Sequence, residues 1–294
     1  MNRIKTVVIP VAGYGTRFLP ATKCIPKEML NILDRPLIDY AISEAVGAGI
    51  ENFIFITNPA NILPKSYMLK NTKLEKYLTH KNKETILKKI NKFNVHSNRI
   101  KIINQDKPLG LGNAVYQAKS LLKKEDFAII LPDDLILQNN CTKELINVYL
   151  KKNTNVLAVM EVEKRNIKNY GVIKPLKKVM NITEVESLVE KPSSKPPSNF
   201  GIVGRYILKN SIFKYLKSIR KGSGDEYQLT DALSLSLKNE KIFASKFRGY
   251  RYDCGSKKGF LQAQIACALR DKELSQNFKK MIKKEYDKMK RAKS

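Results

Sequence analysis

The sequence predicts an α/β fold with a largely parallel central sheet. Short apolar runs alternate with segments whose apolar residues recur at helical spacing, which is typical of strand–helix–strand units. The apolar runs at residues 4–11, 53–56, 100–103 and 127–131 predict buried strands. The length of 294 residues allows one large domain or two small ones.

The first of these strands leads into a turn and then a helix. Gly13 and Gly15 are turn residues that bound the strand at 4–11. Pro36 suits the first turn of a helix, where its missing N–H costs nothing, and helical spacing continues to residue 48. Because ligands bind at the carboxyl ends of strands in such sheets, motifs directly after strands are the strongest site candidates.

Two segments are expected to lie outside the sheet. Residues 61–98 are rich in Lys and Asn and contain helical patches, which predicts a helical excursion. Residues 271–294 predict a basic C-terminal helix with a single apolar stripe, made of Phe278, Met281, Ile282, Tyr286 and Met289. We expect a surface helix packed on the domain, in preference to a membrane or nucleic-acid element.

Composition narrows the class of protein. The 55 Lys and Arg against 27 Asp and Glu give a net charge of +28, which indicates an anionic partner: nucleic acid, acidic membrane or phosphorylated small molecules. The cysteines never form a CxxC pair, which disfavours structural zinc and favours a reduced intracellular protein. Only 2 histidines are present, which disfavours His-based triads. No signal peptide or apolar run of membrane-spanning length is evident, so we expect a cytoplasmic protein.

The glycine turn continues into a cationic segment. Its Gly-x-Gly spacing lets backbone N–H groups approach phosphate oxygens, although alone it is a weak signal. Phe18 replaces the third glycine of the dinucleotide fingerprint, and no P-loop motif is present. Three cations lie close to the turn: Arg17, Lys23 and Lys27. This combination favours binding of a triphosphate over an ordinary strand-to-helix turn.

The run GYGTRFLPATKCIPKEML resembles the signature of bacterial UTP–glucose-1-phosphate uridylyltransferases (UDP-glucose pyrophosphorylases), which are sugar-1-phosphate nucleotidylyltransferases. The likeness continues in order through ILPDDL, YGVI, VEKP, SNFGIVGRY, GDEYQLTDA and DCGSKKGF. It implies a Rossmann-like nucleotidyltransferase fold, with a mixed, mostly parallel central sheet flanked by helices. We expect one domain over residues 1–270, with its nucleotide half at about 1–135 and its sugar-phosphate half at about 136–270, followed by the basic helix.

Two aspartates are candidate magnesium ligands. Asp133 follows an apolar strand, where a carboxylate would face the ligand crevice, and Mg²⁺ prefers carboxylate and phosphate oxygens. Asp133 matches the family's metal-binding aspartate, and Asp253 matches a second ligand in related enzymes. A helix cap or turn is the alternative for the pair Asp133 and Asp134, but helical pattern begins only near Cys141.

The resemblance also assigns the substrate contacts. Those implied for the nucleotide are Ala12, Gly13, Gly15, Thr16, Glu28, Gln105 and Gly110. Those implied for the sugar phosphate are Gly171, Glu190, Lys191 and Gly201. A carboxylate can accept hydrogen bonds from sugar hydroxyls and an ammonium group can meet a phosphate, although the dipeptide Glu190-Lys191 alone is more often a surface ion pair. The resemblance assigns catalytic charge neutralisation to Arg17, Lys27 and Lys191.

The implied reaction is transfer of the uridylyl group of UTP to α-D-glucose 1-phosphate, giving UDP-glucose and pyrophosphate by Mg²⁺-assisted in-line attack. The attacking phosphate oxygen is already anionic, so no side chain must remove a proton. The resemblance also implies a homo-oligomer, a dimer or tetramer, and we expect no specific nucleic-acid or membrane partner. Asn104 and Asn113 depart from the family's usual Arg and His, which puts nucleotide affinity in question.

Three alternatives remain open. A related enzyme would use another nucleotide, such as dTTP, or another sugar phosphate, but the motifs PATK…PKEML and GDEYQLTDA are more particular to the uridylyltransferases. A non-catalytic regulatory paralogue can lose the Thr-Arg pair after the glycine turn, and Thr16 and Arg17 are present here. Nucleic-acid binding is supported by net charge alone, since the tail's charges are not interleaved with stacking aromatic residues.

Overall fold

A mixed nine-stranded sheet with the order β5-β4-β1-β6-β11-β8-β12-β10-β9 organises the protein. The computed structural model describes residues 3–59, 61, 63–93, 95–177 and 181–291. The strands of the sheet are β1 Thr6–Val11, β4 Asn52–Thr57, β5 Ile100–Asn104, β6 Phe127–Ile130, β8 Asn155–Glu161, β9 Gly171–Pro175, β10 Ile182–Glu190, β11 Phe200–Leu208 and β12 Ile242–Lys246. Two short pairs lie outside it: β2 Asn31–Ile32 with β3 Arg35–Pro36, and β7 Asp134–Leu137 with β13 Tyr250–Asp253.

The two halves of the sheet differ in strand direction. The four strands predicted from apolar runs are β1, β4, β5 and β6, and they pair in parallel. From β11 onward antiparallel pairing dominates, since β11 is antiparallel to both β6 and β8. The predicted mixed α/β architecture is therefore confirmed, and the parallel part lies in the N-terminal half.

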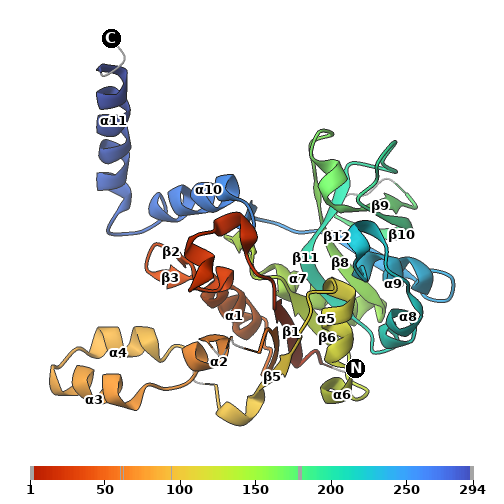
Figure 1. Cartoon of the computed structure of the whole chain (residues 1–294), viewed down its shortest axis with the longest axis horizontal. Helices are drawn as coiled ribbons and strands as arrows, with labels where there is room; N and C mark the ends of the chain where they lie inside the picture. Colours follow the sequence, from red (N-terminus) through yellow and green to blue (C-terminus); the bar gives the residue numbers. More distant parts are fainter. Residues whose placement is uncertain (1–2, 60, 62, 94, 178–180, 292–294) are drawn as a thin grey trace.

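Helices cover both faces of the sheet (Figure 1). Those packed on the sheet include α1 and α7 on one face and α5, α8 and α9 on the other. The helices of the described residues are α1 Leu37–Gly47, α2 Leu63–Met68, α3 Thr72–His80, α4 Glu84–Ile90, α5 Leu111–Gln117, α6 Lys119–Leu122, α7 Cys141–Lys152, α8 Ile212–Ser218, α9 Leu229–Ser236, α10 Lys257–Ala268 and α11 Ser275–Arg291. Short 3₁₀ segments are η1 Thr16–Phe18, η2 Ala21–Lys23, η3 Lys27–Met29, η4 Ser97–Arg99, η5 Ile167–Asn169 and η6 Ser223–Asp225.

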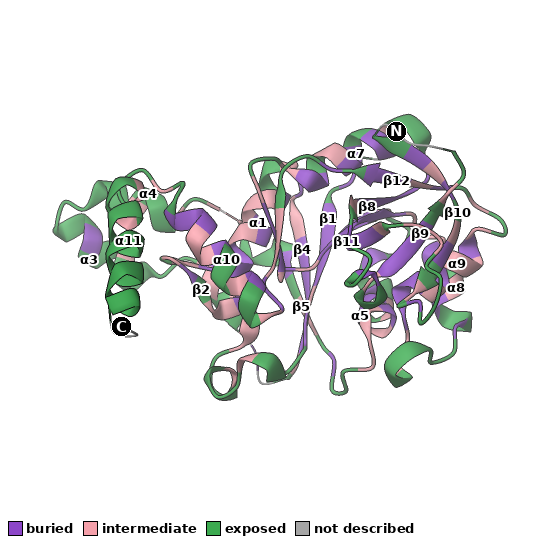
Figure 2. Cartoon of the chain, turned by 90° about the horizontal axis from the view of Figure 1, so that it is seen from above, coloured by how far each residue is buried: buried purple, intermediate pink, exposed green. Residues whose placement is uncertain are grey.

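Most of the core lies in two apolar layers, one on each face of the sheet, and smaller clusters lie around Leu135 and around Val172. Successive strand side chains point to opposite faces, so Val7 and Ile9 of β1 join one layer and Val8 joins the other. The first layer includes Ile42 of α1 and Leu145 of α7, and the second includes residues of α5, α8 and α9. Figure 2 shows the buried strands at the centre, with exposed surface on the flanking helices.

The helical excursion predicted over residues 61–98 is present as α2, α3 and α4, which extend away from the sheet (Figure 1). A buried carboxylate on α1 holds it to the domain. Asp39 is fully buried, and it accepts hydrogen bonds from the Tyr67 hydroxyl at 2.7 Å and from the Lys92 ammonium at 2.6 Å. Lys92 and Arg35, whose Nε donates to the same carboxylate at 2.5 Å, therefore compensate a charge that would be costly to bury alone.

The C-terminal helix forms as predicted, but the expectation that it packs on the domain is wrong. Helix α11 projects from the end of α10 (Figure 1), and none of its residues, all of which are described, is buried. The exposed fractions are 60% for Met281, 44% for Ile282, 59% for Tyr286 and 62% for Met289. Amphipathic spacing predicts a helix without specifying what covers its apolar face. No helix within the described ranges has the length and apolar character needed to span a membrane.

Candidate functional site

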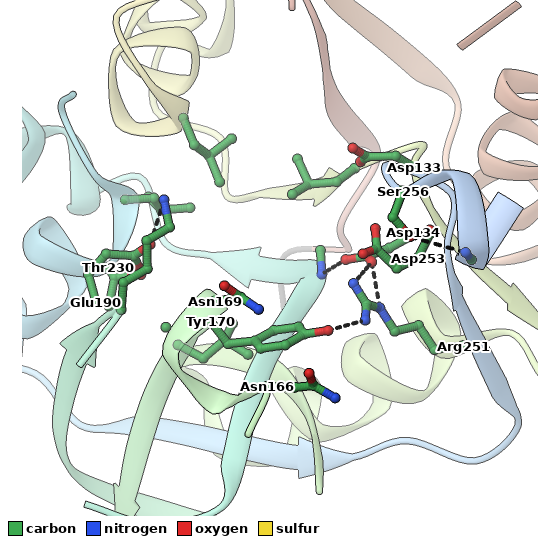
Figure 3. Close-up of a pocket in the computed structure, with 18 of the residues that line it drawn as sticks. Asp133, Asp134, Asn166, Asn169, Tyr170, Glu190, Thr230, Arg251, Asp253 and Ser256 are labelled. Atoms are coloured by element: carbon green, nitrogen blue, oxygen red, sulfur yellow. Dashed lines mark hydrogen bonds and ion pairs between the residues drawn. The ribbon is translucent and has the colours of Figure 1, made fainter. Parts of the chain in front are cut away.

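A pocket of about 820 Å³ lies between the two halves of the sheet, beyond the carboxyl end of β6 (Figure 3). It brings together six of the residues predicted from the sequence: Arg17, Asp133, Gly171, Glu190, Lys191 and Asp253. The carboxylates of Asp133 and Asp253 lie at one end of the pocket, and Glu190 lies at the other (Figure 3). The pocket therefore has two chemically distinct ends.

The two predicted metal ligands converge at the first end. A Cβ placed on Gly255 would stand 3.1 Å from an oxygen of Asp133 and 3.1 Å from an oxygen of Asp253, so both carboxylates border the same space. Arg17 reaches this corner as well, donating to the Gly255 carbonyl at 3.3 Å. Within the described residues, this corner included, no group of three or more His, Cys, Asp or Glu side chains is placed to hold a metal ion, so the two carboxylates would need oxygens from outside the protein to complete a coordination shell. The arrangement fits Mg²⁺, which typically takes one or two carboxylates and completes its shell with phosphate oxygens and water.

Lys27 pairs with the Asp133 carboxylate. Its ammonium donates to the Asp133 Oδ2 at 2.7 Å, and both side chains are partly exposed. Burial alone would lower the pKa of Lys27, but the charge of Asp133 outweighs it and raises the pKa above its ordinary value. Burial likewise would raise the pKa of Asp133, and Lys27 instead holds it below its ordinary value. Both groups therefore carry their charges at neutral pH.

The adjacent Asp134 has a different role. Its Oδ1 accepts a hydrogen bond from the Arg251 Nε at 2.5 Å, and its Oδ2 accepts one from the Gly204 N–H at 2.6 Å. Both carboxylate oxygens thus have protein donors, which leaves Asp133 as the member of the pair that faces the open space. The structure therefore distinguishes the roles of two adjacent aspartates that look alike in the sequence.

A buried arginine fixes the backbone on either side of Asp133. Arg205 of β11 donates to the Leu131 carbonyl at 2.9 Å and to the Asp134 carbonyl at 2.7 Å. Its guanidinium also forms a two-pronged ion pair with Glu44 of α1, with an Nη2–Oε2 distance of 2.8 Å. Arg205 is only 2% exposed, so this clamp operates away from water, where such contacts are strongest.

The second end of the pocket is built around the pairing of β9 with β10. Glu190 lies opposite Gly171 in the register, and a Cβ on Gly171 would stand only 3.0 Å from the Glu190 carboxylate. Burial raises the pKa of Glu190, and a hydrogen bond from Thr230 partly offsets the increase. The Lys191 ammonium lies 3.8 Å from the Glu190 carboxylate and is partly exposed. Gly201 does not line the pocket; its missing side chain makes room for Tyr170 and Val162.

The glycine turn leaves its backbone accessible. A Cβ on Gly13 would meet nothing within 4 Å, so a ligand can approach the main chain closely there. Gly15 has a φ of +62°, and its carbonyl accepts a hydrogen bond from the Thr22 hydroxyl at 2.8 Å. Ala12 is buried at the end of β1, and Thr16 begins η1. The turn and the segment after it are therefore folded onto each other.

The remaining nucleotide candidates lie near the ends of β4 and β5. Glu28 is 2% exposed, and it accepts a hydrogen bond from the Asn61 amide at 2.7 Å. Burial raises the pKa of Glu28 to about 7, because the hydrogen bonds that favour its charged form only partly compensate. The amide of Gln105 donates to Asn113 at 2.7 Å, so one departure from the family pattern contacts a predicted base-binding residue.

Gly110 is held by the distant GDEYQLTDA motif. It has a φ of +99°, and a Cβ there would come within 2.8 Å of the Tyr227 carbonyl. The Gly112 N–H donates to that carbonyl at 2.8 Å, and the Tyr227 N–H donates to the Leu109 carbonyl at 2.8 Å. The motif therefore docks the loop before α5, while its Gln228 and Thr230 line the pocket.

Sequence reasoning missed Tyr170, Thr230 and Arg251, which line the pocket, and also Arg205, which does not line the pocket but holds the Asp133 loop. Arg205, Tyr170, Thr230 and Arg251 all lie in or beside the motifs that carried the resemblance. Only Arg251 had a local signal, since it precedes Asp253 by two positions and strand alternation puts both on one face. The contacts of the others depend on long-range pairing that a single sequence does not reveal.

Comparison with known proteins agrees with this geometry. The sequence model of the nucleotidyl transferase family matches residues 6–269. This chain belongs to the nucleotidyl transferase family. The UTP–glucose-1-phosphate uridylyltransferase of Staphylococcus epidermidis is 41% identical over 285 residues, covering 96% of this nucleotidyl transferase and 99% of the relative. The resemblance inferred from the motifs is thereby confirmed.

Two solved structures share the fold of this nucleotidyl transferase. The UTP-bound enzyme of Acinetobacter baumannii is 35% identical, with a TM-score of 0.86 over 95% of this chain and 98% of that chain. A UDP-glucose pyrophosphorylase complexed with UDP-glucose is 37% identical, with a TM-score of 0.82 over 91% of this chain and 100% of that chain. The fold predicted from the resemblance is therefore confirmed over nearly the whole chain.

Proposed function

We propose that this protein transfers the uridylyl group of UTP to α-D-glucose 1-phosphate, forming UDP-glucose and pyrophosphate. The observation that carries the proposal is the meeting of two unlike ends in one pocket. Asp133, Asp253 and Arg17 border a space suited to a metal and phosphates, and Glu190 with Lys191 borders one suited to a sugar phosphate. An enzyme that joins a nucleotide to a sugar phosphate needs both.

Asp133 and Asp253 would hold the Mg²⁺ ion, because their oxygens border one space and phosphate oxygens can complete the shell. When bound, the ion would offset the negative charge that builds up on the α-phosphate during transfer. Lys27 would keep Asp133 ionised and therefore able to bind a cation, through the ion pair between them.

The chain's own cations would orient the two anionic substrates. Lys191 would bind the phosphate of glucose 1-phosphate, and the neighbouring Glu190 carboxylate would accept hydrogen bonds from sugar hydroxyls. Arg17 and Lys27 would neutralise the triphosphate. Since the attacking phosphate oxygen is already an anion, the rate would depend on positioning and charge compensation, with no general base.

The nucleotide would lie along the glycine turn and the ends of β4 and β5. The residues that we propose for it are Ala12, Gly13, Gly15, Thr16, Glu28, Gln105 and Gly110. The amide oxygen of Gln105 or a carboxyl oxygen of Glu28 can accept a hydrogen bond from the N–H group of uracil. Gly171 would let the sugar approach the backbone. Gly201 would not contact the sugar, and its missing side chain leaves room for the ring of Tyr170.

The test is pyrophosphate release by the purified protein with Mg²⁺, across UTP, dTTP, CTP and ATP, each with and without glucose 1-phosphate and other sugar phosphates. We expect release only with both substrates and Mg²⁺, and fastest with UTP. A preference for dTTP would identify the related enzyme instead. Absence of turnover across the panel would refute the enzymatic proposal.

Site variants test the residue roles. Asp133→Asn and Lys191→Ala should each lower turnover by about two orders of magnitude or more while leaving the fold intact, because the first removes a carboxylate that would hold Mg²⁺ and the second removes the cation that would bind the sugar phosphate. Lys164→Ala, at an exposed lysine, is the matched control. Circular dichroism checks the fold, and wild-type turnover in either site variant would contradict its role.

The remaining proposals concern organisation. We propose a cytoplasmic homo-oligomer with one catalytic domain over residues 1–270, divided near residue 135, and the basic helix beyond it. Light scattering coupled to size-exclusion chromatography measures the oligomeric state. A monomer at the concentrations used for activity would contradict the oligomer.

A further inference from the structure

Arg251 lines the pocket near the candidate metal ligands Asp133 and Asp253, on the side that faces Tyr170 (Figure 3). Its Nε donates to the Asp134 carboxylate at 2.5 Å, and its Nη1 donates to the Tyr170 hydroxyl at 2.7 Å. The Arg251 and Asp134 side chains are each 10% exposed, so the ion pair is largely shielded from water. One guanidinium group thus contacts two different walls of the pocket.

On the metal side, Arg251 reaches the candidate ligands through the β7–β13 pair. Arg251 and Asp253 are two positions apart on β13, so their side chains lie on one face of the strand. Asp253 lies opposite Asp134 in the register, and Asp134 directly follows Asp133. By holding the Asp134 carboxylate, Arg251 holds the strand ends that carry both candidate metal ligands.

On the sugar side, Tyr170 connects Arg251 to the backbone of Lys191. The Tyr170 carbonyl accepts a hydrogen bond from the Lys191 N–H at 3.0 Å. Lys191 has a φ of +43°, a left-handed conformation that a side-chain-bearing residue keeps only when its surroundings impose it. The ring of Tyr170 fits against Gly201, where a Cβ would come within 3.2 Å of the ring carbon Cγ.

We propose that Arg251 and Tyr170 are positioning residues that couple the two ends of the pocket. Arg251 fixes Asp133 and Asp253 through Asp134, and through the Tyr170 hydroxyl it fixes the turn that presents Lys191. The metal carboxylates and the sugar-phosphate lysine are thereby held at a set separation. This inference deepens the proposed function and rests on it.

The test uses three variants of the full chain and one control. Tyr170→Phe removes only the hydroxyl that Arg251 contacts. Arg251→Lys keeps a cation beside Asp134 but lacks the guanidinium fork that reaches two partners. Arg251→Met removes the cation altogether. Tyr250→Phe is the matched control, because Tyr250 is the neighbouring residue on β13 and is 53% exposed.

We expect Tyr170→Phe and Arg251→Lys each to raise the KM for glucose 1-phosphate about tenfold, the size of one hydrogen bond to a charged group, with little change in the KM for UTP. Because both break the same contact, the double variant should be no worse than either single variant. Arg251→Met should in addition weaken Mn²⁺ binding in the presence of UTP about tenfold, measured by electron paramagnetic resonance. Tyr170→Phe and Tyr250→Phe should leave Mn²⁺ binding unchanged.

Losses that multiply in the double variant would overturn the proposal, because they would make the two residues independent. An unchanged KM for glucose 1-phosphate in Tyr170→Phe would do the same, as would wild-type Mn²⁺ binding in Arg251→Met. If the two residues had a purely structural role, the variants would lower Tm without selectively raising the KM for glucose 1-phosphate over the KM for UTP. If the wild type lacks turnover, the proposed function fails, and the Mn²⁺ titration still reports whether Arg251 positions the carboxylates.

Discussion

The Arg205–Glu44 pair provides a quantitative test of how the Asp133 loop is held. The Arg205→Met variant keeps most of the side-chain volume and removes the buried cation. The Glu44 side chain is only 8% exposed. In the variant its carboxylate keeps, among the described residues, the hydrogen bonds from the Thr142 N–H at 2.9 Å and the Thr142 hydroxyl at 2.7 Å. The substitution also removes the donor to the carbonyls of Leu131 and Asp134.

Removing one partner of a buried ion pair costs about 3–5 kcal/mol, because the other charge stays buried without compensation. At roughly 2–4 °C per kcal/mol for a domain of this size class, we expect Tm to fall by roughly 6–20 °C. Urea unfolding followed by circular dichroism measures the free energy directly. A loss below about 1 kcal/mol would refute the reasoning, because it would mean that water or rearrangement satisfies Glu44.

The Glu44→Met/Arg205→Met double variant separates stability from function. With both charges removed, at least half of the lost stability should return, because no uncompensated charge remains. Turnover should nevertheless stay low, because the carbonyls of Leu131 and Asp134 still lack the hydrogen bonds from Arg205. A double variant with restored turnover would show that Arg205 stabilises the fold without positioning the loop.

Three further predictions concern other parts of the molecule. Because Glu28 is held neutral in the fold up to a pKa of about 7 while the unfolded carboxyl ionises near 4.5, stability should fall as pH rises between these values. Glu28→Gln should therefore gain stability over the wild type by up to about 3 kcal/mol between pH 5 and pH 8, measured by urea unfolding; a constant difference would contradict this. Gly112→Ala would place a Cβ 2.7 Å from the Tyr227 carbonyl, so we expect a loss of about 1–3 kcal/mol and a raised KM for UTP. Gly224→Ala is the comparison: its position is open but has a φ of +73°, so it should cost about 1–2 kcal/mol through backbone strain and leave the KM for UTP unchanged. Deleting residues 275–294 should leave Tm and kcat unchanged, because no described residue of α11 is buried; a large fall in Tm would show that another surface covers it.

Local pattern was enough to predict the parallel half of the sheet. The run at residues 4–11 contains β1, Thr6–Val11, and the run at 127–131 contains β6, Phe127–Ile130, because continuous apolar runs are what a strand buried on both faces requires. The short strands β7 and β13 are too brief to predict in this way, since the apolar part of β7 is only Leu135, Ile136 and Leu137. They form where residues 134–137 pair with residues 250–253, a contact between distant parts of the chain.

The candidate site was predicted by residue type more reliably than by role. Adjacent aspartates in one motif look alike in the sequence, yet Gly204 and Arg251 occupy the oxygens of Asp134 and leave Asp133 facing the pocket. Gly201 was expected to line the sugar pocket and instead accommodates Tyr170. In each case the deciding partner is remote in sequence, so spacing alone could not have identified it.

Net charge is a poor guide to the site because two of the cations that shape the pocket do not face phosphates. Arg205 and Arg251 are directed at protein carboxylates and carbonyls, and both are shielded from solvent. A cation bound in this way adds little to the field that attracts an anionic substrate, but it determines where Asp133 and Asp253 stand. The excess of +28 over the whole chain therefore indicates anionic partners only in general, whereas the placement of the buried Arg205 and the largely shielded Arg251 shapes the pocket.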